Sequence, residues 1–229
     1  MQYELIRSKR KTIAISFDRD GNLCVKAPYF VSKRTIEQFV KEKEDWILAT
    51  AKRLKNQKMQ EIANRKKLEN GDILSYLGDK KVLTVLREER QRGKVISTPG
   101  RMIMHIPYDA DYEMKKQLLE KWYRKEAADI LSVKAEEFSK QLKVTYKDIR
   151  IKDQKSRWGS CSSKGNLNFN YKIIMAPEVV CDYVVIHELC HLVHMNHSPE
   201  FWALVESICP GYKQYVKWLK ENGNQLNIS

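Results

Sequence analysis

The chain has 229 residues with a formal net charge of +13, and 42% of its residues are hydrophobic. This composition is typical of a globular protein and excludes wholesale disorder. No apolar run approaches the roughly 20 residues of a membrane helix, and the first residues lack the apolar middle of a secretory signal, so we expect a cytoplasmic protein without a membrane partner.

The positive charge is concentrated toward the N-terminus. Residues 1–69 contain 17 Lys or Arg against 9 Asp or Glu, a net charge of +8, whereas residues 70–142 carry +2 and residues 143–229 carry +3. Basic surfaces attract polyanions. The N-terminal part is therefore expected to meet nucleic acid or an acidic partner, unless its charge serves solubility alone.

The first hundred residues predict strands, one long helix and more strands. Residues 3–27 predict a hairpin with a turn at 18–21, because apolar and polar residues alternate on both sides of that turn. Ser32 is the expected N-cap of a helix that runs to about residue 67. Its expected apolar stripe consists of Ile36, Phe39, Val40, Trp46 and Ile47. Further strands are expected at residues 73–77, 82–86, 94–97 and 102–106.

The second half predicts a helix, a small sheet and two more helices. The first helix covers residues 110–142, and its expected inward face consists of Leu118, Leu119, Trp122, Ile130 and Phe138. Strands are expected at residues 144–151 and 167–174, joined by a loop at 156–166. Pro177 introduces a helix over residues 178–195, and a final helix over 199–222 should break at Pro210-Gly211.

This order of elements predicts an α+β protein with two domains. A small sheet backed by one helix, with a second helix beneath it, is the plan of a minimal zincin core. We expect residues 110–229 to form this hydrolase domain. Residues 1–109 would form an N-terminal accessory module of sheet and helix.

Residues 187–191 carry the motif HExxH on the helix expected at 178–195. Residues four apart on a helix lie about 40° apart around its axis and one turn along, so His187 and His191 can reach one metal ion. Glu188 projects to the neighbouring side, where it can act on a water molecule as the catalytic base without binding the ion. Imidazole ligands favour zinc over magnesium or calcium.

Three residues are candidates for the third ligand. His194 shares the helical face but lies about 4.5 Å farther along the axis than His191, which carries its side chain past the ion. His197 follows an Asn that can end the helix, so the chain can turn back and present this imidazole from outside. Glu206 would supply a carboxylate instead.

The surrounding residues resemble a known family. The segments Arg157–Ser162, 166–170 and HELCHLVHMNHSPEFW at 187–202 are similar to the YgjP-like metal-dependent hydrolases, relatives of the SprT-like zincins. The resemblance covers residues 150–220, including Pro210-Gly211-Tyr212, and rests only on general layout before residue 110. It implies a minimal zincin fold and a metal triad of His187, His191 and His197.

Two further residues are candidates for catalysis. Arg157 precedes a strand that would border the cleft, where an extended substrate can pair, and it can stabilise negative charge on the substrate. The alternative for its loop is a tight structural turn. Tyr212 can donate a hydrogen bond to an oxyanion or, alternatively, pack in the core.

The leading hypothesis is therefore a zinc metallopeptidase that cleaves polypeptides with a water molecule activated by Glu188. One alternative is a nucleoside triphosphate (UTP) pyrophosphatase, since some similar proteins carry that assignment and the Arg/Ser/Gly/Lys loop can hold phosphates. Another is a nucleic-acid-binding module with a structural zinc. The intact Glu188 argues against this last alternative, because a structural site has no use for that carboxylate.

Overall fold

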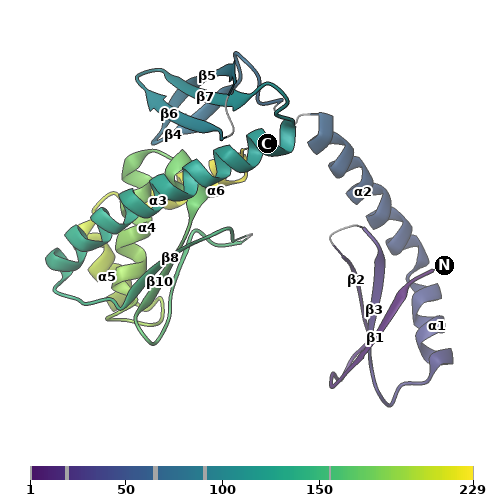
Figure 1. The fold of residues 1–229 in the computed structure, drawn as a ribbon. Helices are drawn as coiled ribbons and strands as arrows, with labels where there is room; N and C mark the ends of the chain where they lie inside the picture. The colour runs from purple at the N-terminus through teal and green to yellow at the C-terminus, as the bar shows by residue number, and fades with distance from the viewer. Residues whose placement is uncertain (1, 19–20, 64–66, 90–91, 155, 229) are drawn as a thin grey trace. The chain divides into compact units, whose positions relative to one another are not determined.

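The computed structural model describes residues 2–18, 21–63, 67–89, 92–154 and 156–228 (Figure 1). The chain divides into two compact units, Met1–Arg65 and Lys66–Ser229. Both units combine helices with strands, which confirms the predicted α+β class. None of the helices in these ranges is both long enough and apolar enough to cross a membrane.

The first unit contains a three-stranded sheet. Its strands are β1 (Glu4–Ser8), β2 (Ala14–Phe17) and β3 (Leu23–Pro28), in the order β1-β3-β2. β2 and β3 are antiparallel and correspond to the predicted hairpin, while β1 is a separate strand that pairs with β3 in parallel. The predicted turn at 18–21 includes residues 19 and 20, which lie outside the described part of the chain.

Two helices follow where one was predicted, α1 (Lys33–Glu42) and α2 (Glu44–Ala63). Ser32 is the N-cap of α1, as expected, because its side chain accepts a hydrogen bond from the Thr35 N–H. The interruption at Lys43 ends the regular apolar spacing, and Trp46 is 50% exposed rather than part of the stripe. The buried residues of this unit form a core of their own. They are Leu23, Val25, Ala27, Ile36, Val40 and Ile47.

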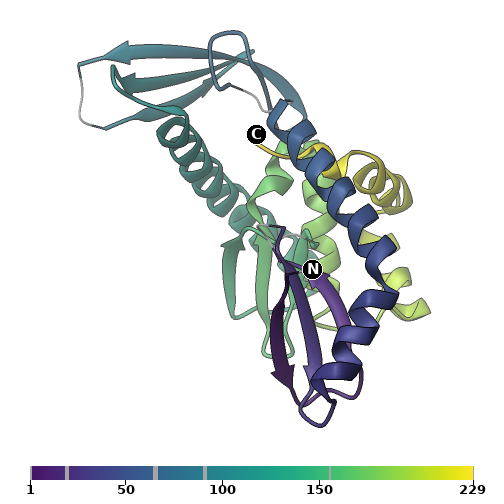
Figure 2. The same cartoon turned by 90° about the vertical axis from the view of Figure 1, so that its right-hand side faces the viewer.

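The second unit begins with a four-stranded sheet in the order β4-β5-β7-β6. Its strands are β4 (Ile73–Tyr76), β5 (Asp79–Glu88), β6 (Lys94–Thr98) and β7 (Arg101–Pro107). The sheet packs on the N-terminal half of helix α3 (Tyr112–Leu142), where the Tyr123 hydroxyl donates to the Ser75 carbonyl at 2.7 Å (Figures 1 and 2).

The inward face of α3 differs from the predicted one. Its fully buried residues recur at every fourth position, and they are Lys115, Leu119, Tyr123, Ala127, Leu131, Ala135 and Ser139. Of the predicted face only Leu119 belongs to this line, while Leu118, Trp122, Ile130 and Phe138 are half-buried. Small side chains such as Ala127 and Ala135 occupy the central line because they allow neighbouring backbones to approach closely.

The remaining elements are the motif helix and the segments around it. They are β8 (Asp148–Lys152), β9 (Gly159–Cys161), β10 (Asn166–Asn170), the short 3-10 helix at Tyr171–Met175, α4 (Glu178–Cys190), α5 (Pro199–Ile208), α6 (Tyr212–Asn222) and a 3-10 turn at Gly223–Gln225. The break between α5 and α6 lies at Pro210-Gly211, as predicted. The expected loop at 156–166 contains β9, which pairs antiparallel with β10 at the edge of the sheet β8-β10-β9.

The boundary between the compact units lies at residues 65 and 66. The predicted domain boundary at residues 109 and 110 falls within the second unit, between its four-stranded sheet and α3. The division into an accessory module of residues 1–109 and a hydrolase domain of residues 110–229 stays a prediction.

Candidate metal centre

Helix α4 carries the motif residues through the core of the second unit. Its residues Val180, Val185 and Leu189 are almost fully buried. The helix starts directly against the four-stranded sheet, because a side chain at Gly78 would lie 2.9 Å from Cα of Pro177. Gly78 also has a φ of +86°, which suits glycine. The position of the motif helix is thus fixed at its N-terminal end.

Three imidazoles converge at the other end of α4. His187 lies on its last turn and His191 is its C-cap, while His197 precedes the start of α5. One nitrogen of each ring lies within 4.8 Å of the others, and the Nε2 atoms of His187 and His197 are 3.2 Å apart. Of the three candidates for a third ligand, the structure therefore brings His197 to the pair.

The chain turns back earlier than the sequence predicted. Helix α4 ends at Cys190 rather than at residue 195. The carbonyl of His194 lies 3.0 Å from Nδ1 of His191, and this contact closes the turn. His194 therefore contributes its backbone carbonyl to the site, and its ring lies outside the cluster. The carboxylate of Glu206, which is exposed on α5, also lies outside the cluster.

The ring nitrogens that face away from the cluster have partners. Nδ1 of His191 can donate to the His194 carbonyl, and Nδ1 of His187 lies 3.4 Å from the hydroxyl of Tyr183. Burial and the neighbouring histidines lower the pKa of His187 to about 3, and burial lowers the pKa of His191. His187 is therefore neutral at pH 7, and burial favours the neutral form of His191 as well, so this set of imidazoles fits a divalent transition metal.

Aromatic rings hold the three imidazoles in place. Phe201 stacks on His191 with ring centroids 4.5 Å apart, and Trp202 lies 5.6 Å from His197 at 30°. Tyr212 stacks on Trp202, with ring centroids 5.1 Å apart and planes at 16°. Tyr212 thus lies one ring away from the histidines and contributes to packing. A role for Tyr212 at an oxyanion stays a prediction.

Glu188 is buried beside the histidines against the edge strand. Its side chain lies so close to β9 that a Cβ atom at Gly159 would be 2.6 Å from its Cγ and Oε1. Among the described residues, its Oε2 atom has no hydrogen-bond partner. Burial raises the pKa of Glu188 to about 8, although the backbone of Cys161 and the charge of Arg157 favour the ionised form. A cation at the histidines would lower this pKa again.

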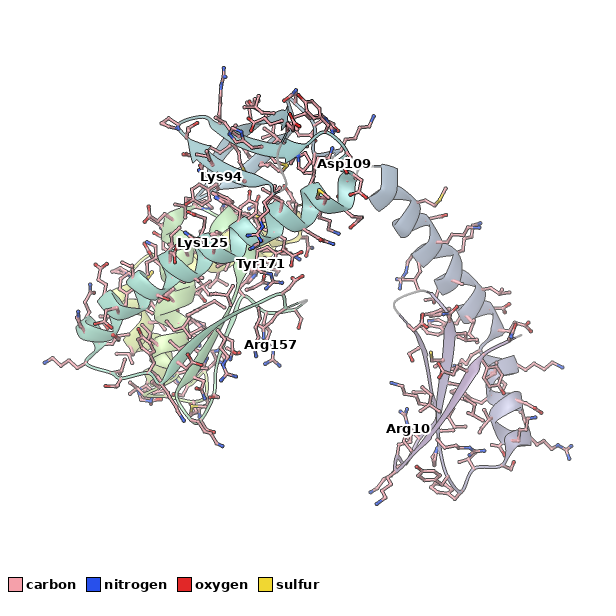
Figure 3. The ribbon with its side chains drawn as sticks, viewed as in Figure 1. Arg10, Lys94, Asp109, Lys125, Arg157 and Tyr171 are labelled. Carbon is pink, nitrogen blue, oxygen red and sulfur yellow. The ribbon has the colours of Figure 1, made fainter. Side chains whose placement is uncertain are left out.

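Arg157 lies on the loop that leads into β9 (Figure 3). The buried Asn170 side chain fastens this loop by donating to the carbonyls of Gln154 and Arg157, at 2.7 and 3.3 Å. The guanidinium is exposed, and its charge acts on Glu188. The structure places Arg157 just before β9, the strand that borders Glu188 through Gly159, and a contact of Arg157 with a substrate stays a prediction.

Sequence reasoning missed several residues that shape this centre. Tyr183 precedes His187 by one helical turn, and this i,i+4 spacing could have identified it. Phe201 and Trp202 are the third and fourth residues after the N-cap Ser198, which places them on the first turn of α5, where their rings lie near His197. Gly159 and Asn170 lie in segments that carry the family resemblance, but their individual roles depend on contacts across the sheet that the sequence does not show.

The chain also matches a family of known proteins. A family model described as "YgjP-like, metallopeptidase domain" matches residues 11–222. Among solved structures, the chain is similar to the metallopeptidase zymogen of Pyrococcus abyssi abylysin, with 26% sequence identity and a TM-score of 0.37. That similarity covers 40% of this chain and 93% of the other. The curated proteins gave no match.

Proposed function

This chain belongs to the YgjP-like metallopeptidase family, as the resemblance of residues 187–202 indicated, and on that premise we propose that it is a zinc-dependent peptidase. The observation that carries the proposal is the convergence of His187, His191 and His197 within 4.8 Å, beside the buried Glu188. Buried carboxylates usually have hydrogen-bond partners or charges to pair with. The unpartnered Oε2 of Glu188 is therefore suited to a water molecule.

We assign a minimal zincin plan to residues 110–229, which lie in the second unit. Helix α4 would be the active-site helix, α3 the backing helix against which it packs, and β8-β10-β9 the small sheet. Residues 1–109 would be the accessory module. The family model matches residues 11–222 and so extends over most of this part of the chain as well.

His187, His191 and His197 would hold the zinc ion through the nitrogens that face one another. When bound, zinc polarises a substrate carbonyl and lowers the pKa of water at the site to about 7. Tyr183 and the His194 carbonyl orient two of the imidazoles from behind.

The chain's own residues would then direct the chemistry. Oε2 of Glu188 takes a proton from the attacking water and later delivers it to the nitrogen of the leaving amine. Strand β9 lies at the edge of its sheet and borders Glu188 through Gly159, so an extended polypeptide can pair with it beside the carboxylate. The exposed guanidinium of Arg157 stabilises negative charge that develops on the substrate.

A second candidate activity is hydrolysis of a nucleoside triphosphate such as UTP. It is favoured by a pocket of about 540 Å³ next to β9, whose lining includes Arg157, Lys172, Asn170 and Asn224. Two cations and several amides suit a phosphate chain and a base. Asp153 pairs with Lys172 at 2.9 Å and reduces the net charge of this pocket, which favours the peptidase.

One pair of assays separates the two candidates. Zinc-loaded protein is incubated with an unfolded, fluorescently labelled polypeptide and, separately, with UTP. A peptidase releases labelled fragments and no pyrophosphate, and a metal chelator stops the cleavage. Pyrophosphate release without polypeptide cleavage would replace the peptidase assignment with the second candidate.

The contact between Gly159 and Glu188 leads to a test of the edge strand. Gly159→Ala is expected to displace Glu188, because the new methyl group would lie 2.6 Å from its side chain. A misplacement of about 1 Å lowers turnover by about 10²-fold. Zinc content should not change. Ser160→Ala is the control, because Ser160 bonds Asn168 within the sheet and should retain wild-type turnover. Full activity of Gly159→Ala would disprove this placement of Glu188.

The hydroxyl of Tyr183 gives a second test, on metal affinity. Tyr183→Phe removes the partner of Nδ1 of His187, and the loss of such a partner typically weakens zinc binding by about 10- to 100-fold. Competition with a chromophoric chelator measures this affinity. Tyr215→Phe, on a neighbouring ring, is the control and should bind zinc as the wild type does. Equal affinities of both variants would mean that Tyr183 does not orient His187.

A further inference from the structure

The first unit has one sheet end at which basic and aromatic side chains meet. β1 and β3 are parallel, with Ser8 aligned with Pro28, so the segments that follow these strands leave the sheet at the same end (Figure 1). We call the side chains that these segments provide the basic-aromatic edge. It consists of Lys9, Arg10, Lys11, Tyr29, Phe30 and Lys33.

The two rings of this edge are exposed on an ordered turn. Tyr29 is 67% exposed and Phe30 is 80% exposed. Nη1 of Arg7 donates to the carbonyls of Pro28 and Val31, at 2.6 Å each, and so ties both ends of the turn to β1. The hydrogen bonds of Arg7 therefore fix the turn that carries the two exposed rings. Exposed aromatic side chains of this kind mark binding surfaces.

Charge is segregated along this sheet. The carboxylates of Glu4 and Asp18 lie at the opposite end, since Glu4 is aligned with Cys24 and Asp18 follows the last pair of β2 and β3. At the basic-aromatic edge, Arg10 is half-buried, and its Nε atom has no partner among the described residues (Figure 3). The edge therefore presents a concentrated positive field.

The start of α1 adds to this field. Helix N-termini favour acidic side chains, because the helix dipole is positive there. The first turn of α1 has no acidic residue and contains Lys33 and Arg34 instead. Lys33 lies 3.9 Å from the carboxylate of Glu37 on the next turn, an exposed pair that leaves the helix start open to an anion.

We propose that the basic-aromatic edge binds single-stranded nucleic acid, with its cations at phosphates and Tyr29 and Phe30 stacking on bases. Proteins that bind single strands without sequence preference combine a basic surface with exposed aromatic rings in this way. An anionic membrane is less suited to the edge, because two rings offer little apolar area and stable membrane anchoring needs more than one weak signal. The site is independent of the histidine cluster, and so is its test.

Binding is measured with the full-length protein and a labelled oligothymidylate of about 20 nucleotides, by fluorescence anisotropy over a series of salt concentrations. Tyr29→Ser and Phe30→Ser are each expected to weaken binding by about tenfold or more, because a base can no longer stack on the ring. Lys9→Gln/Lys11→Gln is expected to reduce the salt dependence, with the log–log slope falling by about 0.7 for each phosphate that is no longer neutralised.

Two matched variants control for charge and for ring content. Lys52→Gln/Lys55→Gln removes the same charge from exposed positions on α2, and Tyr108→Ser removes a ring that is 68% exposed in the second unit. Both should bind the oligonucleotide as the wild type does. Unchanged thermal midpoints establish that every variant is folded.

Three outcomes would overturn the proposal. The first is no binding of the oligonucleotide at low salt. The second is that the control variants weaken oligonucleotide binding as much as the variants of the edge do. Binding would then depend on the overall charge of the protein and not on this surface. The third is binding to vesicles of phosphatidylcholine and phosphatidylserine without binding to the oligonucleotide, which would assign the edge to anionic lipid.

Discussion

Glu188→Gln is expected to remove peptidase activity while leaving the metal in place. The amide has nearly the same shape as the carboxylate and fits against Gly159, but it cannot accept the proton of the attacking water. Loss of a positioned general base lowers turnover by about 10²- to 10⁴-fold. Because Glu188 is outside the histidine cluster, zinc content should equal that of the wild type. Both quantities are measured on the same preparation.

Glu206→Gln is the matched control for this variant. Glu206 is exposed on α5 and was a sequence-level candidate for the third ligand, yet its carboxylate is not in the cluster. The control should keep both zinc and activity. Wild-type turnover in Glu188→Gln would contradict the assignment of Glu188 as the base.

His197→Ala is expected to weaken zinc binding more than any single change at a residue outside the histidine cluster. It removes one of three ligands, so its effect should exceed the about 10- to 100-fold cost of losing an orienting partner. His197 is exposed and lies between helices, so its replacement should leave the fold intact. The dissociation constant is measured by chelator competition, and the thermal midpoint of the metal-free protein reports on folding.

The neighbouring histidine provides the comparison. His194→Ala keeps the backbone carbonyl that holds His191, and its ring is outside the cluster. Its zinc affinity should stay close to that of the wild type. If His197→Ala bound zinc normally and His194→Ala did not, the third ligand would be His194. The chain after α4 would then follow a different path from the one described.

The ligand spacing could be predicted because it depends on a single helix. His187 and His191 are related by one turn of α4, and no tertiary contact is needed to place them on one face. The end of α4 could not be predicted in the same way. It lies at Cys190, and the turn that follows brings the His194 carbonyl to Nδ1 of His191, a contact between a backbone group and a ring that propensities do not encode.

Other differences have similar causes. Strand β9 has three residues and no apolar alternation, so only its pairing with β10 reveals it. The inward face of α3 follows small side chains such as Ala127, whereas hydrophobicity alone favoured large ones such as Trp122. Trp46 is outside its predicted stripe because a break at Lys43 ends the regular spacing. Strand pairing, helix packing and a helix break thus decided these three outcomes, and single-residue propensities report none of them.

Metal analysis of the purified wild-type protein tests the central claim most directly. The convergence of His187, His191 and His197 predicts about one zinc ion per chain, measured by inductively coupled plasma mass spectrometry. It also predicts that this zinc is lost in the His197→Ala variant. A wild-type protein that holds no divalent metal, even after exposure to zinc, would contradict the metal centre and the peptidase with it.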